Sequence, residues 1–179
     1  PKATNDYLHS KGFKSIYMID PAPKAEKGYF IDDQLMENGY YVRTAEGEPF
    51  TGDVWPGKCH FPDFTRPEVR TWWSGLYKDF MAQGIDGVWN DMNEPAIFGG
   101  IDMSMPTDNL HLGGDGLAAG PHLRYHNQYG FNMVKASYYG IRNANPKLRP
   151  FVLSRANCLG GQRYAATWTG DNRSSWAHL

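Results

Sequence analysis

The sequence lacks the features that mark several large classes of protein. Only two of its 179 residues are cysteines, Cys59 and Cys158, and they offer neither a disulfide framework nor the spacing of metal ligands. The formal net charge is −1 and no run of Lys and Arg is present, so a nucleic-acid partner is not expected. No apolar run approaches the roughly 18 residues of a membrane-spanning helix, so no membrane partner is expected either.

The N-terminal segment lacks two further features. Residues 1–10 do not show the charged-then-apolar layout of a signal peptide, and the sequence does not begin with Met. We therefore expect a piece of a longer chain. The compartment stays open, with a slight preference for the cytoplasm, and the oligomeric state is not determined by the sequence.

Aromatic and apolar residues are plentiful. Hydrophobic residues make up 41% of the chain and aromatic residues 15%, which is the composition of a globular enzyme with a sizeable core. Tryptophan and tyrosine rings stack on the apolar faces of sugars and bases, although most of them are expected in the core or its walls.

The hydrophobic pattern predicts strands that alternate with helices. Residues 7–11 read as the end of a helix closed by Gly12, and strands are expected over residues 12–20, from 85 to Asp91, over 150–154 and before Asp171. Helices are expected over residues 65–83 and 122–143. Residues 24–58 and 99–120 form long polar or Gly-rich connections, of which the first is expected to be functional or to carry small elements of its own.

Three elements carry more detailed expectations. The run Ile16, Tyr17, Met18 and Ile19 is expected to be buried in the first strand. Thr65 and Glu68 have the spacing of a capping box at the start of the first long helix. Its buried face is predicted at Val69, Trp72, Trp73, Leu76, Tyr77, Phe80 and Met81, and that of the second long helix at Tyr129, Met133, Ala136, Gly140 and Ile141.

A polar residue closes each expected strand: Asp20, Asp91, Arg155 and Asp171. Alternation of strands and helices indicates a parallel sheet, and parallel α/β proteins build their sites at the carboxyl ends of the strands. The order suits consecutive strands of a (β/α)8 barrel. Because such a barrel needs about 250 residues, this chain would hold roughly half of one.

Asp91 and Asp171 are the candidate catalytic residues. Two carboxylates on neighbouring strand ends are what glycoside hydrolysis needs, one to attack or activate water and one to protonate the leaving oxygen. Polar neighbours and a cation such as Arg155 would favour the ionised form of Asp91. Burial against Trp168 is expected to favour the neutral acid at Asp171.

The motifs around these residues resemble those of glycoside hydrolase family 31, the retaining α-glucosidase and α-xylosidase family. The segment 89–94 (WNDMNE) is similar to the nucleophile signature of that family, and residues 55–57 (WPG) and 61–64 (FPDF) are similar to the segment that precedes it. Residues 154–155 (SR) and 161–172, which include WTGDN at 168–172, resemble the acid/base segment. The matches follow in order from about Gly12 to the C-terminus.

This resemblance implies a role for each residue. Asp91 would be the nucleophile and Asp171 the general acid/base, in an α-glucosidase that cleaves terminal α-linked glucose by double displacement and uses no cofactor or metal. Trp55, Trp89, Met92 and Trp168 would line the sugar pocket. Arg155 would contact a sugar hydroxyl and the acidic cluster, or instead only brace the loop by pairing with Glu94. Asp20 would bind a hydroxyl, or instead serve as a strand-end turn residue.

The resemblance also implies what this chain does not contain. The family has a sugar-binding Asp on the strand before Asp20 and a sugar-binding His beyond the acid/base segment, and His178 is too close to Asp171 to be that His. Residues 1–179 are thus expected to be a partial (β/α)8 catalytic domain, roughly strands 3 to 6, with both carboxylates and an incomplete pocket. The family's β-sandwich and β-domains would lie elsewhere in the parent chain.

Four alternatives remain at this stage. One is a metal enzyme in which Asp91, Asn93 and Glu94 supply oxygen ligands to Mg²⁺ or Ca²⁺. Another is a non-catalytic sugar-binding module, against which the presence of both carboxylates argues. The other two are different activities of the same family. One is an α-xylosidase or transglycosylase, and the other is an α-glucan lyase. The expected partner is an oligosaccharide or α-glucoside substrate.

Overall fold

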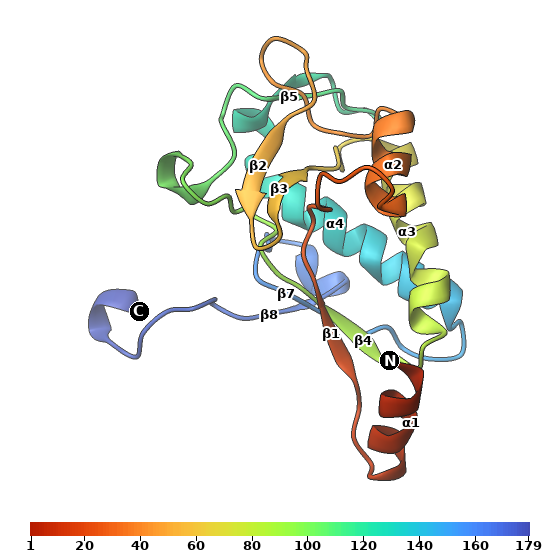
Figure 1. Ribbon diagram of the computed structural model, residues 1–179. Helices are drawn as coiled ribbons and strands as arrows, with labels where there is room; N and C mark the ends of the chain where they lie inside the picture. The colour runs from red at the N-terminus through yellow and green to blue at the C-terminus, as the bar shows by residue number, and fades with distance from the viewer.

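Four parallel strands form the centre of the molecule. A computed structural model describes residues 1–179 and places β1 (Ile16–Ile19), β4 (Gly87–Asn90), β7 (Val152–Ser154) and β8 (Ala166–Thr167) side by side in that order. The order in the sheet is therefore the order in the chain, as in consecutive strands of a (β/α)8 barrel. The sheet is open, with β1 and β8 at its edges (Figure 1).

The remaining elements lie around this sheet. The α-helices are α1 (Lys2–Ser10), α2 (Phe30–Glu37), α3 (Pro67–Met81) and α4 (His122–Ala144). Two hairpins pair β2 (Thr51–Val54) with β3 (Gly57–His60) and β5 (Leu110–His111) with β6 (Gly120–Pro121). The 3₁₀ turns are η1 (Ile101–Met103), η2 (Gly161–Arg163) and η3 (Trp176–His178). None of the helices combines the length and apolar character that a crossing of the membrane requires.

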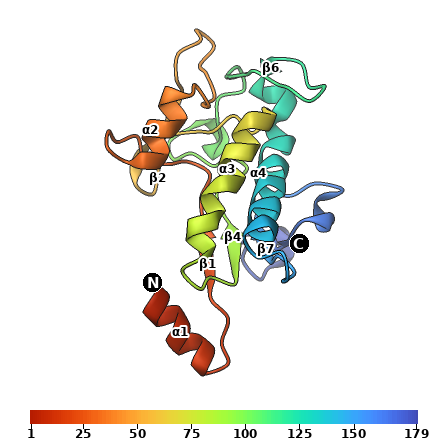
Figure 2. The same cartoon turned by 90° about the vertical axis from the view of Figure 1, so that its right-hand side faces the viewer.

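Helices α3 and α4 pack against each other and cover one face of the sheet (Figure 2). The hydroxyl of Ser74 donates to the carbonyl oxygen of Ala136 at 2.7 Å. Gly140 permits the close approach, because a Cβ there would lie 2.7 Å from the Tyr77 ring. The inward face predicted for residues 122–143 is confirmed, since all five of its residues are buried. Helix α3 belongs to the crossover that puts β4 beside β1, and α4 to the crossover that puts β7 beside β4.

The start of α3 differs from the sequence prediction. Its N-cap is Arg66, no side chain caps it, and the Thr65 hydroxyl instead donates to Asp63 at 2.6 Å and accepts from the N–H of Gly113 at 3.0 Å. The predicted capping box of Thr65 and Glu68 does not form, so this prediction is wrong. Asp63 is only two residues before Thr65, and the long connection over residues 99–120 brings Gly113 beside the hydroxyl, so both of its hydrogen bonds are made away from the helix end.

The predicted burial of the first strand is only half right. Tyr17 and Ile19 pack against the core, but Ile16 is 42% exposed and Met18 is 49% exposed. Side chains alternate between the two faces of a strand. Those of Ile16 and Met18 point to the face that the helices do not cover, and no further strands close over that face in this chain.

Both long connections contain structure of their own. Residues 24–58 hold α2, the strand β2 and the start of β3, and residues 99–120 hold η1, β5 and the first residue of β6. The prediction that the first connection carries small elements is confirmed. These connections lie at the end of the molecule to which the carboxyl ends of the strands point (Figure 1).

Candidate active site

The carboxyl ends of the central strands are aligned by their register. Ile19 pairs with Asn90, and Asn90 pairs with Ser154. The next residue in each strand's chain is Asp20, Asp91 or Arg155, so these three polar side chains emerge from one edge of the sheet. Asp171 comes four residues after the end of β8 rather than at the strand end itself.

Arg155 joins the acidic residues of this edge. Its Nε and Nη2 atoms donate to the two carboxylate oxygens of Glu94 at 2.8 and 2.9 Å, in the bidentate geometry favoured by guanidinium groups. Its Nη1 atom lies 3.3 Å from Asp91 Oδ1 and 3.5 Å from Asp171 Oδ2. The hydrogen bonds to Glu94 raise the pKa of Arg155 further above its already high usual value, against the opposing effect of burial. Arg155 thus holds a permanent positive charge between the two candidate catalytic carboxylates.

Asp91 is the more enclosed of the two carboxylates. It is 8% exposed, and its backbone N–H donates to the carbonyl oxygen of Ile19 at 3.3 Å. Met92, which follows it, has a φ of 55° and is buried, with its sulfur 3.1 Å from Arg155 Nη2. A non-glycine residue in this left-handed region is uncommon and turns the chain sharply away from the strand. The turn brings Glu94 back to Arg155.

Asp20 belongs to the same cluster. Burial raises the pKa of its carboxyl group to about 6, and the negative charges of Asp91 and Glu94 act in the same direction, whereas Arg155 opposes them. Partial removal from water is the larger cause, and repulsion by the other carboxylates adds to it. Asp20 follows β1 as Asp91 follows the neighbouring strand β4, so the two carboxyl groups lie at the same edge of the sheet.

Three buried polar atoms at this edge have no hydrogen-bond partner within the protein: Asp20 Oδ1, Asp91 Oδ1 and Trp89 Nε1. Asp91 Oδ1 is near Arg155, but at an ion-pair distance rather than in hydrogen-bond geometry. Most buried polar groups in proteins are paired. Two acceptors and one donor beside each other can bind the hydroxyl groups of a polar ligand.

The residues predicted to line the sugar pocket lie in two places. The rings of Trp89 and Trp168 meet edge to face, with centroids 5.4 Å apart, at the ends of β4 and β8. Trp55 lies in the turn between β2 and β3, is 70% exposed and packs edge to face on Phe98 at 4.9 Å. The structure thus groups Trp89, Met92 and Trp168 with the charged cluster, while Trp55 stands on the hairpin beside it.

The environment expected for Asp171 is wrong for this chain. Its side chain is 92% exposed, not buried against Trp168. The physical reason is the open edge of the sheet, because nothing packs over β8 and the segment that follows it. In Figure 1 this segment extends away from the body of the molecule.

The ligand set of the metal hypothesis does not converge. The amide of Asn93 bonds to Ser154 and to the backbone of Ala156, and the carboxylate of Glu94 bonds to Arg155. No group of three or more His, Cys, Asp or Glu side chains is arranged to hold a metal ion.

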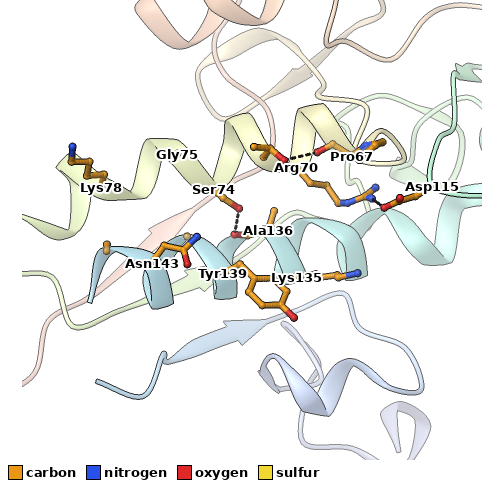
Figure 3. A pocket seen from close by; sticks show the side chains of 13 residues that line it. Pro67, Arg70, Ser74, Gly75, Lys78, Asp115, Lys135, Ala136, Tyr139 and Asn143 are labelled. Carbon is orange, nitrogen blue, oxygen red and sulfur yellow. Dashed lines mark hydrogen bonds and ion pairs between the residues drawn. The ribbon is translucent and has the colours of Figure 1, made fainter. Parts of the chain in front are cut away.

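The first of two large cavities lies away from this cluster. It is a groove of about 720 Å³ between α3 and α4, with Ser74, Lys78, Lys135 and Asn143 on its walls (Figure 3). Its one carboxylate, Asp115, is paired with Arg70 at 2.7 Å. A second groove, of about 700 Å³, runs beside Asp20 and Met18 at the end of β1. Asp20 of the strand-end cluster borders the second groove, whereas none of the residues that line the first groove belongs to that cluster.

Sequence reasoning missed a second buried polar group. His111 Nδ1 lies 2.8 Å from Asp63 Oδ1, His111 Nε2 lies 2.9 Å from His122 Nδ1, and His122 Nε2 lies 3.1 Å from His126 Nδ1. We call these four residues the histidine chain. The signal in the sequence was weak, because the four positions span more than sixty residues and only Asp63 belongs to a motif that we interpreted, the FPDF segment.

Comparison with known proteins gives a consistent result. The model of the glycosyl hydrolases family 31 TIM-barrel domain matches residues 1–179. Alpha-glucosidase 2 of Bacillus thermoamyloliquefaciens is 42% identical over 175 residues, which are 96% of this chain and 22% of that protein. Neutral alpha-glucosidase AB of Mus musculus is 40% identical over 178 residues, covering 97% of this chain and 18% of that protein.

Solved structures agree in fold. The glucosidase II alpha subunit in its DNJ-bound form matches with a TM-score of 0.86 and 38% identity, over 98% of this chain and 19% of that one. The family 31 alpha-glucosidase of Bacteroides thetaiotaomicron matches with a TM-score of 0.80 and 56% identity, over 99% of this chain and 28% of that one. The chain spans about a fifth of the length of the curated relatives it matches.

Proposed function

Because this chain belongs to glycosyl hydrolase family 31, we propose that it carries both catalytic carboxylates of a retaining α-glucosidase. Asp91 is the nucleophile and Asp171 the general acid/base. Residues 1–179 form part of a (β/α)8 catalytic domain, roughly strands 3 to 6, within a longer protein. The substrate is an oligosaccharide or another α-glucoside.

The reaction proceeds in two displacements. Asp91 attacks the anomeric carbon while Asp171 protonates the departing glycosidic oxygen, which leaves glucose bound to Asp91 as an ester and Asp171 ionised. Asp171 then takes a proton from water, the resulting hydroxide attacks the anomeric carbon, and Asp91 is released as a carboxylate. Two inversions at one carbon return the α configuration.

The observation that carries this proposal is the single Arg155 nitrogen shared by the two carboxylates. Asp91 Oδ1 and Asp171 Oδ2 are both within ion-pair distance of Nη1, so these two oxygens are separated by at most about 7 Å, the sum of the two distances. Retaining enzymes hold their carboxyl groups about 5 to 5.5 Å apart, and inverting enzymes about 6.5 to 9.5 Å. The upper limit on the distance between the Asp91 and Asp171 oxygens supports the shorter separation, which is that of retaining enzymes.

The remaining residues would position the sugar. Asp20 and Trp89 offer buried atoms without partners for its hydroxyl groups. Met92, Trp55 and Trp168 supply apolar surface. Arg155 binds the acidic cluster and, in the complete pocket, a sugar hydroxyl.

Proton NMR of the first sugar released tests the stereochemistry. The full-length protein that carries this segment should release α-glucose from an aryl α-glucoside before mutarotation mixes the anomers. First-formed β-glucose would contradict the assignment of Asp91 as a nucleophile.

A substrate panel separates the other activities of the family. Faster turnover of an α-xyloside than of the matching α-glucoside would indicate an α-xylosidase. An unsaturated sugar product would indicate a lyase, and transfer of glucose to added maltose in preference to water would indicate a transglycosylase.

A further inference from the structure

The amide of Asn93 connects the loop after β4 to the end of β7. Its Nδ2 atom donates to Ser154 Oγ at 2.9 Å, and its Oδ1 atom accepts the backbone N–H of Ala156 at 3.1 Å. The Ser154 hydroxyl in turn donates to the carbonyl oxygen of Ala156 at 2.7 Å. Both Asn93 and Ser154 are completely buried. We call these three hydrogen bonds the Asn93 clasp.

The directions of these bonds are determined by chemistry. A backbone N–H can only donate, so the amide oxygen of Asn93 must face Ala156 and its NH₂ group must face Ser154. The Ser154 hydroxyl then accepts from Asn93 and has its one proton free for the carbonyl oxygen of Ala156. Aspartate or leucine at position 93 could not satisfy the same three groups.

The clasp encloses Arg155 in sequence and in space. Ser154 and Ala156 flank Arg155, while Met92 and Glu94, which flank Asn93, both contact its guanidinium group. The backbone N–H of Arg155 also donates to the carbonyl oxygen of Asn90 at 3.1 Å. The backbone on both sides of Arg155 is thereby tied to the loop that carries Asp91.

Helix α4 prevents the clasp from shifting. A Cβ atom at Gly130 would lie 2.6 Å from the carbonyl oxygen of Asn93 and 2.7 Å from the Cβ of Ala156. The helix backbone is therefore pressed directly against both loops, and only glycine at position 130 permits this contact.

We propose that Asn93 is a positioning residue, which acts through Ser154 and Ala156 to hold the guanidinium group of Arg155 between Asp91 and Asp171. This proposal rests on the proposed function, because it assigns Asn93 a part in the same reaction. Asn93 itself touches neither the substrate nor the reacting atoms. Asn93 affects the rate because it determines where the positive charge of Arg155 lies.

The test uses Asn93→Ala and the milder Ser154→Ala in the full-length protein, with Ser137→Ala as the matched control. Ser137 is equally buried and also loses one side-chain hydrogen bond, from Tyr77 at 2.7 Å, but it lies between α3 and α4 away from the cluster. All three variants should melt at a lower temperature than the wild type.

Only the two clasp variants should change catalysis. We expect kcat on an aryl α-glucoside to fall about 10- to 100-fold with a smaller change in KM, since displacement of a catalytic group by about 1 Å can cost 100-fold. The acidic limb of the pH profile of kcat/KM should move to higher pH, because the carboxylates lose their nearby cation. Ser137→Ala should keep the wild-type kcat and profile. Clasp variants that differ from wild type only in melting temperature, as Ser137→Ala does, would overturn the proposal.

A crystal structure of Ser154→Ala gives a readout that does not depend on activity. The proposal expects the distance from Arg155 Nη1 to Asp91 Oδ1 to widen beyond the 3.3 Å of the intact clasp. An unchanged Arg155 would overturn it. If the wild type cleaved no α-glucoside, the proposed function would fail. The crystal structure would still show whether the Asn93 clasp determines the position of the Arg155 guanidinium group.

Discussion

The two candidate catalytic carboxylates, Asp91 and Asp171, differ strongly in how exposed their side chains are. The side chain of Asp91 is 11% exposed, enclosed by the β4 loop and Arg155, whereas that of Asp171 is 92% exposed. An enclosed carboxylate next to a fixed cation is suited to attack from one position. A carboxylate on a free segment is suited to proton transfer only once further structure packs around it. Asp91 is thus in place within this chain, and Asp171 is not yet enclosed.

The two carboxylates should respond differently to substitution in the full-length protein. Asp171→Ala should retain substantial activity on an aryl glycoside whose phenol leaves without a proton, and azide should restore the second step by attacking without a base. Asp91→Ala removes the attacking atom and should lose several orders of magnitude on every substrate. Steady-state kinetics with and without azide measure both effects. Equal losses with no azide effect would mean that the roles are wrongly assigned.

Asp20 should make the protein less stable as the pH rises. Its pKa is raised from 3.8 to about 6 in the folded state, so the stability it contributes is complete below pH 4 and is lost as the pH rises through 6. Asp20→Asn removes this loss. The melting temperature of the variant, relative to the wild type, should therefore increase between pH 4 and pH 7.

An exposed carboxylate on α3, Asp79, provides the control for this measurement. Asp79→Asn should show no such trend with pH. A constant difference between Asp20→Asn and the wild type from pH 4 to pH 7 would contradict the assigned environment of Asp20.

Elements were predicted well wherever a local pattern determined them. The helices over 65–83 and 122–143 were correct within a few residues, because apolar side chains recur there every three or four positions. The polar ends of β1, β4 and β7 were also correct. A charged residue that directly follows a short apolar run rarely continues the buried strand, so Asp or Arg at that position marks its end.

Several contacts with partners distant in the sequence were not predicted, although the pairing of Arg155 with Glu94 was. The hydroxyl of Thr65 is held by Gly113, Asn93 is held by Ser154, and the histidine chain begins at Asp63. No periodicity encodes such pairs. The exposure of Asp171 was missed for a related reason, since its burial depends on structure outside these residues.

The histidine chain ties β5, α4 and the segment before α3 together, and it should make them sensitive to acid. Burial lowers the pKa of His122 to about 3, and His111 and His126 add to this effect. Burial alone would raise the pKa of Asp63, but the bonds from His111, Thr65 and Leu112 outweigh it and hold that pKa below its usual value. Tyr125 packs edge to face on His111, and Tyr129 packs edge to face on His122.

The lowered pKa values of His122 and Asp63 both make the folded state less stable as the pH falls. A lowered His pKa gives stability that is complete above the unfolded value of 6.5 and is lost as the pH falls toward 3, and a lowered Asp pKa gives stability that is present above the unfolded value of 3.8 and is lost as the pH falls below it. One proton taken up only by the unfolded state costs about 1.4 kcal/mol per pH unit. His122→Gln should therefore be less stable than the wild type at pH 7.5 and should lose less stability on acidification to pH 5.

Melting temperatures at the two pH values measure this difference in the full-length protein. A parallel decline of His122→Gln and the wild type would show that His122 does not bind its proton on unfolding.

The whole molecule is dominated by its two open sheet edges. β1 and β8 each pair on one side only, and the face that carries Ile16 and Met18 is left uncovered. Unpaired strand edges and exposed apolar surface both promote association between molecules. In family 31 the same strands belong to a closed barrel, which removes the edges.

We expect the 179-residue segment, expressed by itself, to be inactive and to self-associate. Asp171 stays exposed without further strands, and poor positioning of the sugar alone can cost about 100-fold in rate. Light scattering after size-exclusion chromatography and an aryl α-glucoside assay measure the two properties. Met18→Lys, which puts a charge on the open face beside the β1 edge, should reduce association of the segment and should destabilise the full-length protein, whose barrel interior would have to bury that charge. A monomeric, cooperatively melting segment that cleaved the glucoside would show instead that the half-barrel is self-sufficient.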